Sequence, residues 1–507
     1  MKKIITLSAV AFLSTALYAN ADMQEQIDQL TKKVQKLEKK TSKINAQSAK
    51  DNIKFDVDFR TSYDNLNYKT VNGNKYENNA LFSNRLWLGM GYAPEGTDMV
   101  FKGQLSFNKA FGASYGQRAT GMGFDTFDWV VNENLTDDKL RVREAYWLWT
   151  PTIGGVGTTF SIGRRPATNG YLINLRDDDK AKSPLGHVIN MEFDGASVGI
   201  SLDSILPGGN FKVCAGRGLT NAASWASQAS GMINPMYPNT GATPNYIPVD
   251  GSLDNTDMLG FIFVPYDDGQ YAVETTYYRG FSVPGMVAKT ANAYYDGTTG
   301  QQMGMEPTSY AMESMGNMDG AAISFKVEGI GDEINDFLDE TIIFASLAWS
   351  KSNPEDVTRN VTMMDVTGTN PDQNMNMTAQ SMLGSDKSET GTSYWIGAQM
   401  PNLTGGKFGL EYNHGSEHWK SFTYGEDTMA GSKMAVRGSA YEAYWTQPIN
   451  KAFSMQVRYT MLDYDYTGSS GFFGDGSTSA EMGSEMSKQM DSIEKAQDIR
   501  VYFRYRY

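Results

Sequence analysis

The sequence predicts an all-β protein: a transmembrane antiparallel β-barrel of about sixteen strands, within a range of roughly fourteen to eighteen. Two observations favour this class. Short segments of alternating apolar and polar residues recur from residue 53 to the end of the chain, as in strands with one apolar face. The connections between them alternate between short turns and long loops, which is typical of a barrel with all its long loops on one side of a membrane.

The first 21 residues are expected to be a signal peptide. Two lysines precede an apolar run at residues 4–17, and a small-x-small sequence at 19–21 provides a cleavage site before Asp22. The run is shorter than the ~20 apolar residues that a membrane-spanning helix needs. We therefore expect an exported protein.

Residues 22–50 are expected to form a periplasmic coiled-coil helix, followed by a barrel over residues 51–507. A heptad pattern of seam positions runs through this segment, at Met23, Ile27, Leu30, Val34, Leu37, Thr41 and Ile44. A coiled coil between identical chains is the favoured interpretation because the seam is narrow, and a trimer would suit the barrel. An amphipathic linker helix packed on the barrel is the alternative.

The composition fits an exported barrel. Only 40% of the 507 residues are hydrophobic and the mean hydropathy is -0.44, as expected when one face of each strand is polar. The net charge of -14 argues against nucleic acid as a partner. The single cysteine, Cys214, excludes a framework of intramolecular disulfides.

The first predicted strand, IKFDVDFRTSY at residues 53–63, has apolar residues on one face and charged residues on the other. Further strands are predicted at 80–92, 98–108, 139–150, 157–165, 188–203, 210–217, 257–265, 270–280, 320–328, 340–350, 393–400, 406–414, 433–446, 452–465 and 496–507. Long loops are predicted at 64–79, 109–138, 166–187, 218–256, 281–319, 351–392, 415–432 and 466–495. Both chain ends then lie on the side of the short turns.

We interpret residues 188–203 as one strand with a bulge at Asp194-Gly195, because the apolar register changes there. Two strands joined by an Asp-Gly turn are the alternative. That alternative would place the loop at 218–256 on the side of the short turns.

Three stretches carry a resemblance to a known family: REAYWLW at 143–149, IGRRPATNGYLINLRDDD at 162–179 and MEFDGASVGISL at 191–202. They resemble a porin-like family defined only as a domain of unknown function, and the whole chain resembles the trimeric porins of Gram-negative outer membranes. The resemblance implies location and shape and no particular substrate. The aromatic-ended last strand resembles the signal that the outer-membrane assembly machinery recognises.

If the apolar positions face lipid, the alternate positions line the lumen and carry many basic residues. They are Arg60, Arg85, Lys102, Arg141, Arg143, one of Arg164 and Arg165, Arg500, Arg504 and Arg506. The last strand of a barrel lies beside the first, so these residues are predicted to form one continuous basic wall. Alternatively, the arginines pair with lumen acids such as Asp56 and Asp58 and only hold the wall in shape.

The third long loop carries three consecutive aspartates, Asp177, Asp178 and Asp179. In general porins this loop folds into the pore, so the resemblance implies an acidic constriction facing the basic wall. Such an arrangement would create a transverse field that orients polar solutes. The alternative is that the aspartates are surface charges, bridged or not by divalent cations.

Glu144 does not fit the pattern. Its register places it on the lipid face with Val142 and Tyr146, where a carboxylate is costly. A subunit interface or a local bulge would resolve this.

No enzyme is predicted. Ser114 lies in a GASYG sequence, but no helix follows it to form a nucleophile elbow. His414 and His418 have the spacing of a helical zinc site, yet they fall where a strand enters a loop. Cys214 is expected on the lumen face without a redox role.

The long loops are rich in methionine, a soft ligand that suits Cu(I). The residues are Met303, Met305, Met312, Met315, Met318, Met363, Met364, Met375, Met377 and Met382. Copper binding is one explanation of these methionines. Compositional drift is the alternative, because methionines also occur throughout the chain.

Two function classes remain open. The first is a passive outer-membrane channel of a Gram-negative bacterium for small hydrophilic solutes or ions, trimeric, without a cofactor. The second is a surface receptor, adhesin or scaffold with a plugged lumen, whose long acidic, Met-rich loops bind a partner or metal.

Overall fold

The computed structural model of the chain describes residues 53–111, 140–165, 168–220, 222–223, 247–248, 253–295, 302–330, 334–355, 358–364, 371–378, 380–381, 383–423, 429–469 and 479–507. The predicted signal peptide, the predicted coiled-coil segment, Ser114 and Met382 lie outside these residues. No helix in the described ranges is long and apolar enough to cross a bilayer.

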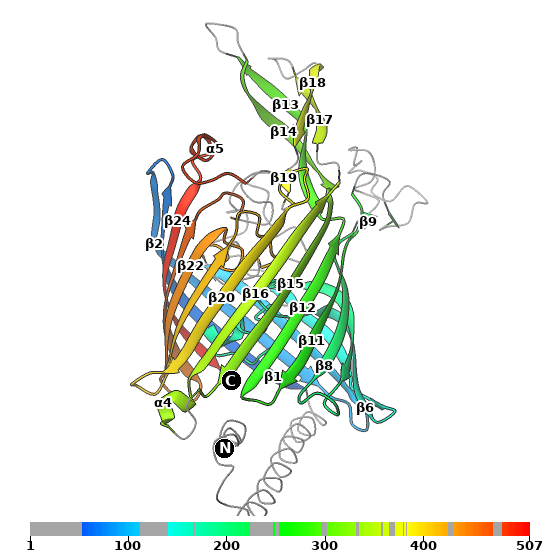
Figure 1. Cartoon of the computed structure of the whole chain (residues 1–507), viewed down its shortest axis with the longest axis vertical. Helices are drawn as coiled ribbons and strands as arrows, with labels where there is room; N and C mark the ends of the chain where they lie inside the picture. The colour runs from blue at the N-terminus through cyan, green and yellow to red at the C-terminus, as the bar shows by residue number, and fades with distance from the viewer. Residues whose placement is uncertain are drawn as a thin grey trace, which may run out of the picture.

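The protein is a closed antiparallel β-barrel (Figure 1). The main sheet has 17 strands, of which two-residue β5 (Thr152–Ile153) only pairs with β6 in a hairpin. The other sixteen form the barrel: β1 (Lys54–Thr70), β2 (Lys75–Tyr92), β3 (Met99–Ala110), β4 (Arg141–Trp149), β6 (Val156–Arg165), β7 (Phe193–Ser201), β8 (Asn210–Leu219), β11 (Thr256–Asp267), β12 (Tyr271–Phe281), β15 (Gly316–Glu328), β16 (Ile342–Pro354), β20 (Thr390–Pro401), β21 (Lys407–Gly415), β22 (Gly438–Pro448), β23 (Phe453–Tyr464) and β24 (Ile493–Arg506). The predicted strand number is confirmed.

The barrel closes where β24 pairs with β1, with Arg504 opposite Arg60 and Tyr505 opposite Phe59. β1 also pairs with β2, so the sheet has no unpaired edge, as a hydrocarbon environment requires. The alternation of the last strand follows the prediction: Phe503 and Tyr505 are exposed on the outer face, whereas Arg504 is buried. The C-terminus lies at the end of the barrel that carries the short turns (Figure 1).

The predicted loop at 64–79 is wrong. β1 and β2 continue through it as a paired hairpin, with Tyr68 opposite Tyr76, and the chain turns only between Thr70 and Asn74. The prediction failed because this hairpin extends beyond the apolar band, where both strand faces are polar and the alternation that marks a membrane strand is absent.

Two predicted loops contain a sheet of their own. Residues 281–319 hold β13 (Pro284–Tyr295) and β14 (Gln302–Ser314), and residues 351–392 hold β17 (Thr358–Met364), β18 (Pro371–Thr378) and β19 (Gln380–Ser381). β13 pairs in parallel with β17, so the two loops form one five-stranded sheet, which rises beyond the barrel rim on the side of the long loops (Figure 1). We call it the extracellular sheet, because the long loops of such barrels are expected on the extracellular side. A further two-stranded sheet joins β9 (Ala222–Ala223) to β10 (Ile247–Pro248).

The predicted strand at 188–203 is shorter in the structure. β7 begins at Phe193 and pairs with β6 without a register shift, so the predicted bulge at Asp194-Gly195 is wrong. Residues 188–192 are buried inside the barrel. Their apolar side chains pack against other apolar groups in the lumen and not against lipid, which explains the change of apolar register.

Candidate functional site

Loop 3 (residues 166–192, described from Thr168) lies inside the barrel. It contains the four-residue helix α2 (Ile173–Arg176), and the side chains of Leu172, Ile173 and Leu185 are fully buried. The other short described helices, α4 (Asp336–Asp339) and α5 (Glu485–Gln489), lie outside the lumen at opposite ends of the barrel (Figure 1).

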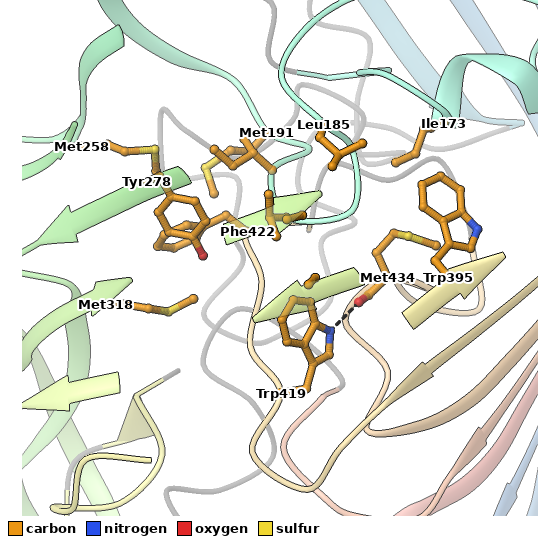
Figure 2. Packing of buried hydrophobic residues seen from close by; sticks show 14 of the residues in the cluster. Ile173, Leu185, Met191, Met258, Tyr278, Met318, Trp395, Trp419, Phe422 and Met434 are labelled. Carbon is orange, nitrogen blue, oxygen red and sulfur yellow. Dashed lines mark hydrogen bonds between the residues drawn. The ribbon is translucent and has the colours of Figure 1, made fainter. Parts of the chain in front are cut away.

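One side of loop 3 belongs to an apolar cluster within the barrel, the loop core (Figure 2). The barrel strands β11 to β20 contribute inward-facing side chains to it, and loop 7 (residues 416–437) contributes three more. Its larger members are Leu172, Ile173, Leu185, Val188, Ile189, Met191, Met258, Tyr278, Met318, Phe344, Trp395, Trp419, Phe422 and Met434. Sequence reasoning missed this core because it assigned every inward position to water.

His187 lies at the boundary between the loop core and the strands. Its two ring nitrogens lie 2.8 and 2.9 Å from the hydroxyl oxygens of Ser346 and Ser393, and its ring packs edge-on against Trp395. Burial lowers the pKa of His187 to about 3, because a charged imidazolium here would lose its hydration. The histidine is therefore neutral, and its protonation opposes the docking of loop 3.

The other side of loop 3 crosses to strands β20–β24. The backbone carbonyls of Leu175, Arg176 and Asp177 accept hydrogen bonds from Gln399 Nε2 (2.7 Å), Gln456 Nε2 (2.8 Å) and Arg504 Nη1 (2.8 Å) respectively. These bonds attach the tip of loop 3 to β20, β23 and β24.

The three predicted aspartates of loop 3 lie against the basic residues of the last strands. Asp179 accepts from Arg504 and Arg506, each with a nitrogen 2.9 Å from Oδ1. Asp177 lies 3.7 Å from Arg458 Nη1, and Asp178 pairs with Lys407. The acidic segment therefore contacts the basic residues of β21, β23 and β24 directly.

The predicted basic residues occupy the inner face of strands around the barrel closure. Arg60, Arg85, Arg143, Arg500 and Arg504 are at most 2% exposed. Arg506 is partly exposed at the end of β24, Lys102 is exposed and Arg141 is half-buried. Arg164 contacts Glu192 at 3.4 Å, whereas the side chain of Arg165 lies outside the described set.

Two arginines of this region were not predicted. Arg458 on β23 pairs in register with Arg500, and Arg176 in loop 3 lies 3.4 Å from Glu442. The alternation of Val457, Arg458 and Tyr459 in a predicted strand was the signal for the first. We call the set Arg60, Arg85, Arg143, Arg458, Arg500 and Arg504 the charged wall.

Acids pair with many residues of the charged wall. Arg504 Nε donates to Asp58 at 2.9 Å, and Arg500 donates to Asp64. Arg143 Nε lies 3.2 Å from the fully buried Glu192. Because charges in a low-dielectric site need such partners, this geometry fits the structural role that the sequence left open for the arginines.

Trp87 on β2 joins two members of the charged wall. The guanidinium carbons of Arg85 and Arg143 lie 3.5 and 4.0 Å from the centre of its ring. Arginine stacked on an aromatic face is held in a fixed orientation, so this part of the wall is rigid.

The predicted lipid-facing position of Glu144 is wrong. A bulge in β4 shifts the pairing between Gln104 and Leu105, so Arg143 and Glu144 both turn inward. Glu144 Oε1 lies 2.8 Å from Lys182 Nζ of loop 3. The side chain that contradicted the barrel pattern thus forms an ion pair within the lumen.

A second group of buried charges lies beneath loop 7. Lys433 Nζ is 2.6 Å from Glu411 and 2.5 Å from Glu442, and Trp395 Nε1 donates to Glu411 at 3.0 Å. Loop 7 therefore has an ionic attachment to β21 and β22.

The remaining candidates do not assemble a site among the described residues. His414 lies on the outer face beside Tyr394, and His418 lies 3.4 Å from Glu389. Cys214 is half-buried on β8. No group of three His, Cys, Asp or Glu side chains in the described ranges has the arrangement of a metal site.

The described methionines are divided between two places. Met315 and Met318 are buried in the loop core with Met312 beside them, and Met377 packs in the extracellular sheet. The side chains of Met303, Met305, Met363, Met364 and Met375 lie outside the described set.

A family comparison identifies the chain. Residues 75–507 match the family described as protein of unknown function DUF3373. The chain belongs to the DUF3373 family. The predicted resemblance to a porin-like family of unknown function is confirmed, and no curated protein sequence matches this DUF3373 chain.

Several solved barrels are similar in structure to the DUF3373 chain. OprB of Pseudomonas putida has a TM-score of 0.44 and 10% identity, covering 92% of this chain and 96% of its own. The anion-selective porin of Comamonas acidovorans has a TM-score of 0.42 and 10% identity, covering 90% and 99%. OmpF of Salmonella typhi has a TM-score of 0.41 and 11% identity, covering 89% and 97%.

Proposed function

We propose that the protein is an outer-membrane channel for small hydrophilic solutes or ions, with a lumen narrowed by loops 3 and 7. One observation carries this proposal: the barrel is closed and apolar outside, and its inner face is densely charged over β21–β24 and β1–β4. Buried charge on this scale is costly in a structure that only has to span a membrane. A path for polar solutes gives it a use.

The two sides of the lumen differ in character. The loop core occupies the side of β11–β20, whereas the charged wall and the aspartates of loop 3 meet on the other side. A cavity of about 400 Å³ at the periplasmic end is lined by residues that include Asp178, Gln399 and Lys407. We infer that solutes cross along the charged side and leave through this cavity.

The other parts of the proposal concern assembly. The predicted signal peptide, the predicted coiled coil and the aromatic C-terminal strand support export to the outer membrane of a Gram-negative bacterium. The heptad seam supports a homo-oligomer, and the resemblance to the trimeric porins favours a trimer.

Planar-bilayer recording of the purified protein tests the proposal. Stepwise currents are expected, with an ion selectivity that shifts towards cations in Arg141→Glu and Arg143→Glu. Each variant should show heat-modifiable gel mobility, which reports a folded barrel. A folded protein that inserts and never conducts would overturn the channel function.

The second function is a surface scaffold, and the extracellular sheet favours it. Glu313 on β14 binds Arg359 Nε of β17 at 2.5 Å and also pairs with Lys289 of β13. A sheet with such ionic links, raised above the barrel, suits partner binding. Normal bilayer currents after its removal, together with a lost cell-surface interaction, would show both functions.

A further inference from the structure

Loop 7 is bonded directly to the returning segment of loop 3. Ile189 and Phe422 form a parallel β-bridge. The backbone N–H of Asn190 donates to the carbonyl of Phe422 at 2.6 Å, and that of Phe422 donates to Val188 at 3.0 Å. Loop 7 thus pairs with loop 3 as one strand of a minimal sheet, although the two loops are far apart in the sequence.

The side chain of Phe422 strengthens this contact. It is fully buried, and its ring centre lies 5.1 Å from that of Tyr278 on β12 (Figure 2). The ring therefore sits between loop 3 and the barrel wall. Losing it would remove an apolar contact from both.

Loop 7 is anchored to the barrel independently of loop 3, by Lys433 on Glu411 and Glu442 and by the backbone N–H of Lys420, which donates to Ser350 Oγ at 3.1 Å. Two further hydrogen bonds hold the loop in shape. Trp419 Nε1 donates to the carbonyl of Met434 at 2.7 Å, and the carbonyl of Trp419 accepts from Arg437 Nε at 3.0 Å. A Cβ at Gly391 of β20 would lie 2.3 Å from the Trp419 backbone, so only glycine allows this approach. The base of loop 7 is accordingly a fixed support.

Two of the attachments of loop 3 differ in character. Its tip is held by polar contacts to β20–β24, including the carbonyl of Asp177 to Arg504. Its returning segment is held by backbone bonds to loop 7 and by apolar contacts in the loop core. Hydrogen bonds at either place can exchange with water, whereas the apolar contacts of the returning segment have no such substitute.

We propose that loop 7, through Phe422, holds loop 3 across the lumen, so that the two loops together set the width of the passage. We call this contact the latch. This inference rests on the proposed channel function for its consequence and on the contacts of loops 3 and 7 for its mechanism. Release of Phe422 frees the returning segment of loop 3 from loop 7 and widens the passage.

Thiol labelling tests the contact between loops 3 and 7 without a measurement of current. Met191 is fully buried in the loop core, so Met191→Cys in a Cys214→Ser background should react slowly with a water-soluble maleimide. Adding Phe422→Ala is expected to raise the labelling rate roughly tenfold or more, as for a locally opened segment. The control is Val361→Ala, which truncates a fully buried apolar side chain in a cluster that contains no residue of loop 3 or loop 7. Equal labelling rates in the two backgrounds would overturn the latch.

A reversible cross-link adds a second test. Residues bridged across neighbouring strands lie ~4.8 Å apart, within the ~4.4–6.8 Å that a disulfide spans. In the Cys214→Ser background, Ile189→Cys with Phe422→Cys should therefore form a disulfide on oxidation. We expect the reduced form to conduct like Phe422→Ala, and the oxidised form to conduct like the parent.

Conductance then separates the two proposals. A rise of roughly twofold in unitary conductance is expected for Phe422→Ala, and none for Val361→Ala, because conductance follows the width of the constriction. Faster labelling in a protein that never conducts supports the latch and overturns the channel. Normal currents with unchanged labelling and conductance support the channel and overturn the latch.

Discussion

The side chains of Arg504 and Asp179 are 325 positions apart in the sequence, and their Nη2 and Oδ1 atoms lie 2.9 Å apart inside the barrel. The same guanidinium donates from Nε to Asp58 of β1 at 2.9 Å. One side chain of the last strand thus connects the first strand to the tip of loop 3.

Replacing Arg504 should therefore destabilise both the barrel closure and loop 3. Removing one partner of a buried ion pair costs about 3–5 kcal/mol, so Arg504→Met is expected to lower the temperature at which the folded gel band disappears. Arg217→Met is the control, because its pair with Asp257 is largely exposed and worth about 1 kcal/mol or less. Equal shifts in the two variants would contradict the role of Arg504.

The bulge in β4 predicts which side chains face water. In a Cys214→Ser background and in lipid, Glu144→Cys should react with a charged thiol reagent, because Glu144 lies in the lumen beside Lys182. Ala145→Cys is the matched neighbour on the outer face and should be protected by lipid. If Ala145→Cys reacts and Glu144→Cys is protected, β4 has the register without a bulge.

His187 should make the docking of loop 3 sensitive to acid. Its pKa is about 3 in the folded protein and 6.5 when exposed, so the folded state binds fewer protons between these values. Stability therefore falls as the pH drops from 6.5 towards 3, by about 1.4 kcal/mol per unit.

The measurement is the melting temperature of the folded gel band at pH 7.5, 6.5, 5.5 and 4.5. His187→Asn should flatten the decrease between pH 6.5 and 4.5, because asparagine keeps polar contacts without titrating. His414→Asn, on the outer face, should leave the decrease unchanged. If both variants decline like the parent, another group controls the acid response.

The extracellular sheet should depend on Glu313. Glu313→Gln leaves Lys289 and Arg359 without their shared carboxylate, which costs about 1–3 kcal/mol for a buried charged group. We expect faster proteolysis within residues 281–319 and no change in the melting of the barrel. Glu328→Gln, at the periplasmic rim, should not alter this proteolysis.

The barrel was predictable because lipid imposes one physical rule on every strand. The alternation of Arg500 and Arg504 with Phe503 and Tyr505 follows from hydrocarbon on one side and polar partners on the other. The rule holds only within the apolar band, so the polar continuation of β1 and β2 beyond it was missed.

The loop core was not predicted, because the strands that contribute to it do not follow the rule of one apolar and one polar face. Phe344 and Tyr278 face inward next to the outward-facing Ile343 and Tyr277, so their strands are apolar on both faces. That pattern is the available signal for packing inside a barrel, but it does not name the packing partner. The pairing of Ile189 with Phe422 depends on two loops whose meeting has no local sequence pattern.

The closing pair of strands also bears on how the protein is made. Arg504 and Asp58 are separated by 446 positions. Their contact therefore closes a loop that spans nearly the whole chain. Such pairings form late, after the intervening hairpins. Since Arg504 also contacts Asp179, its full set of partners exists only when the seam is closed and loop 3 lies inside the barrel. The two ends of the barrel wall and the filling of its interior are therefore stabilised by one side chain.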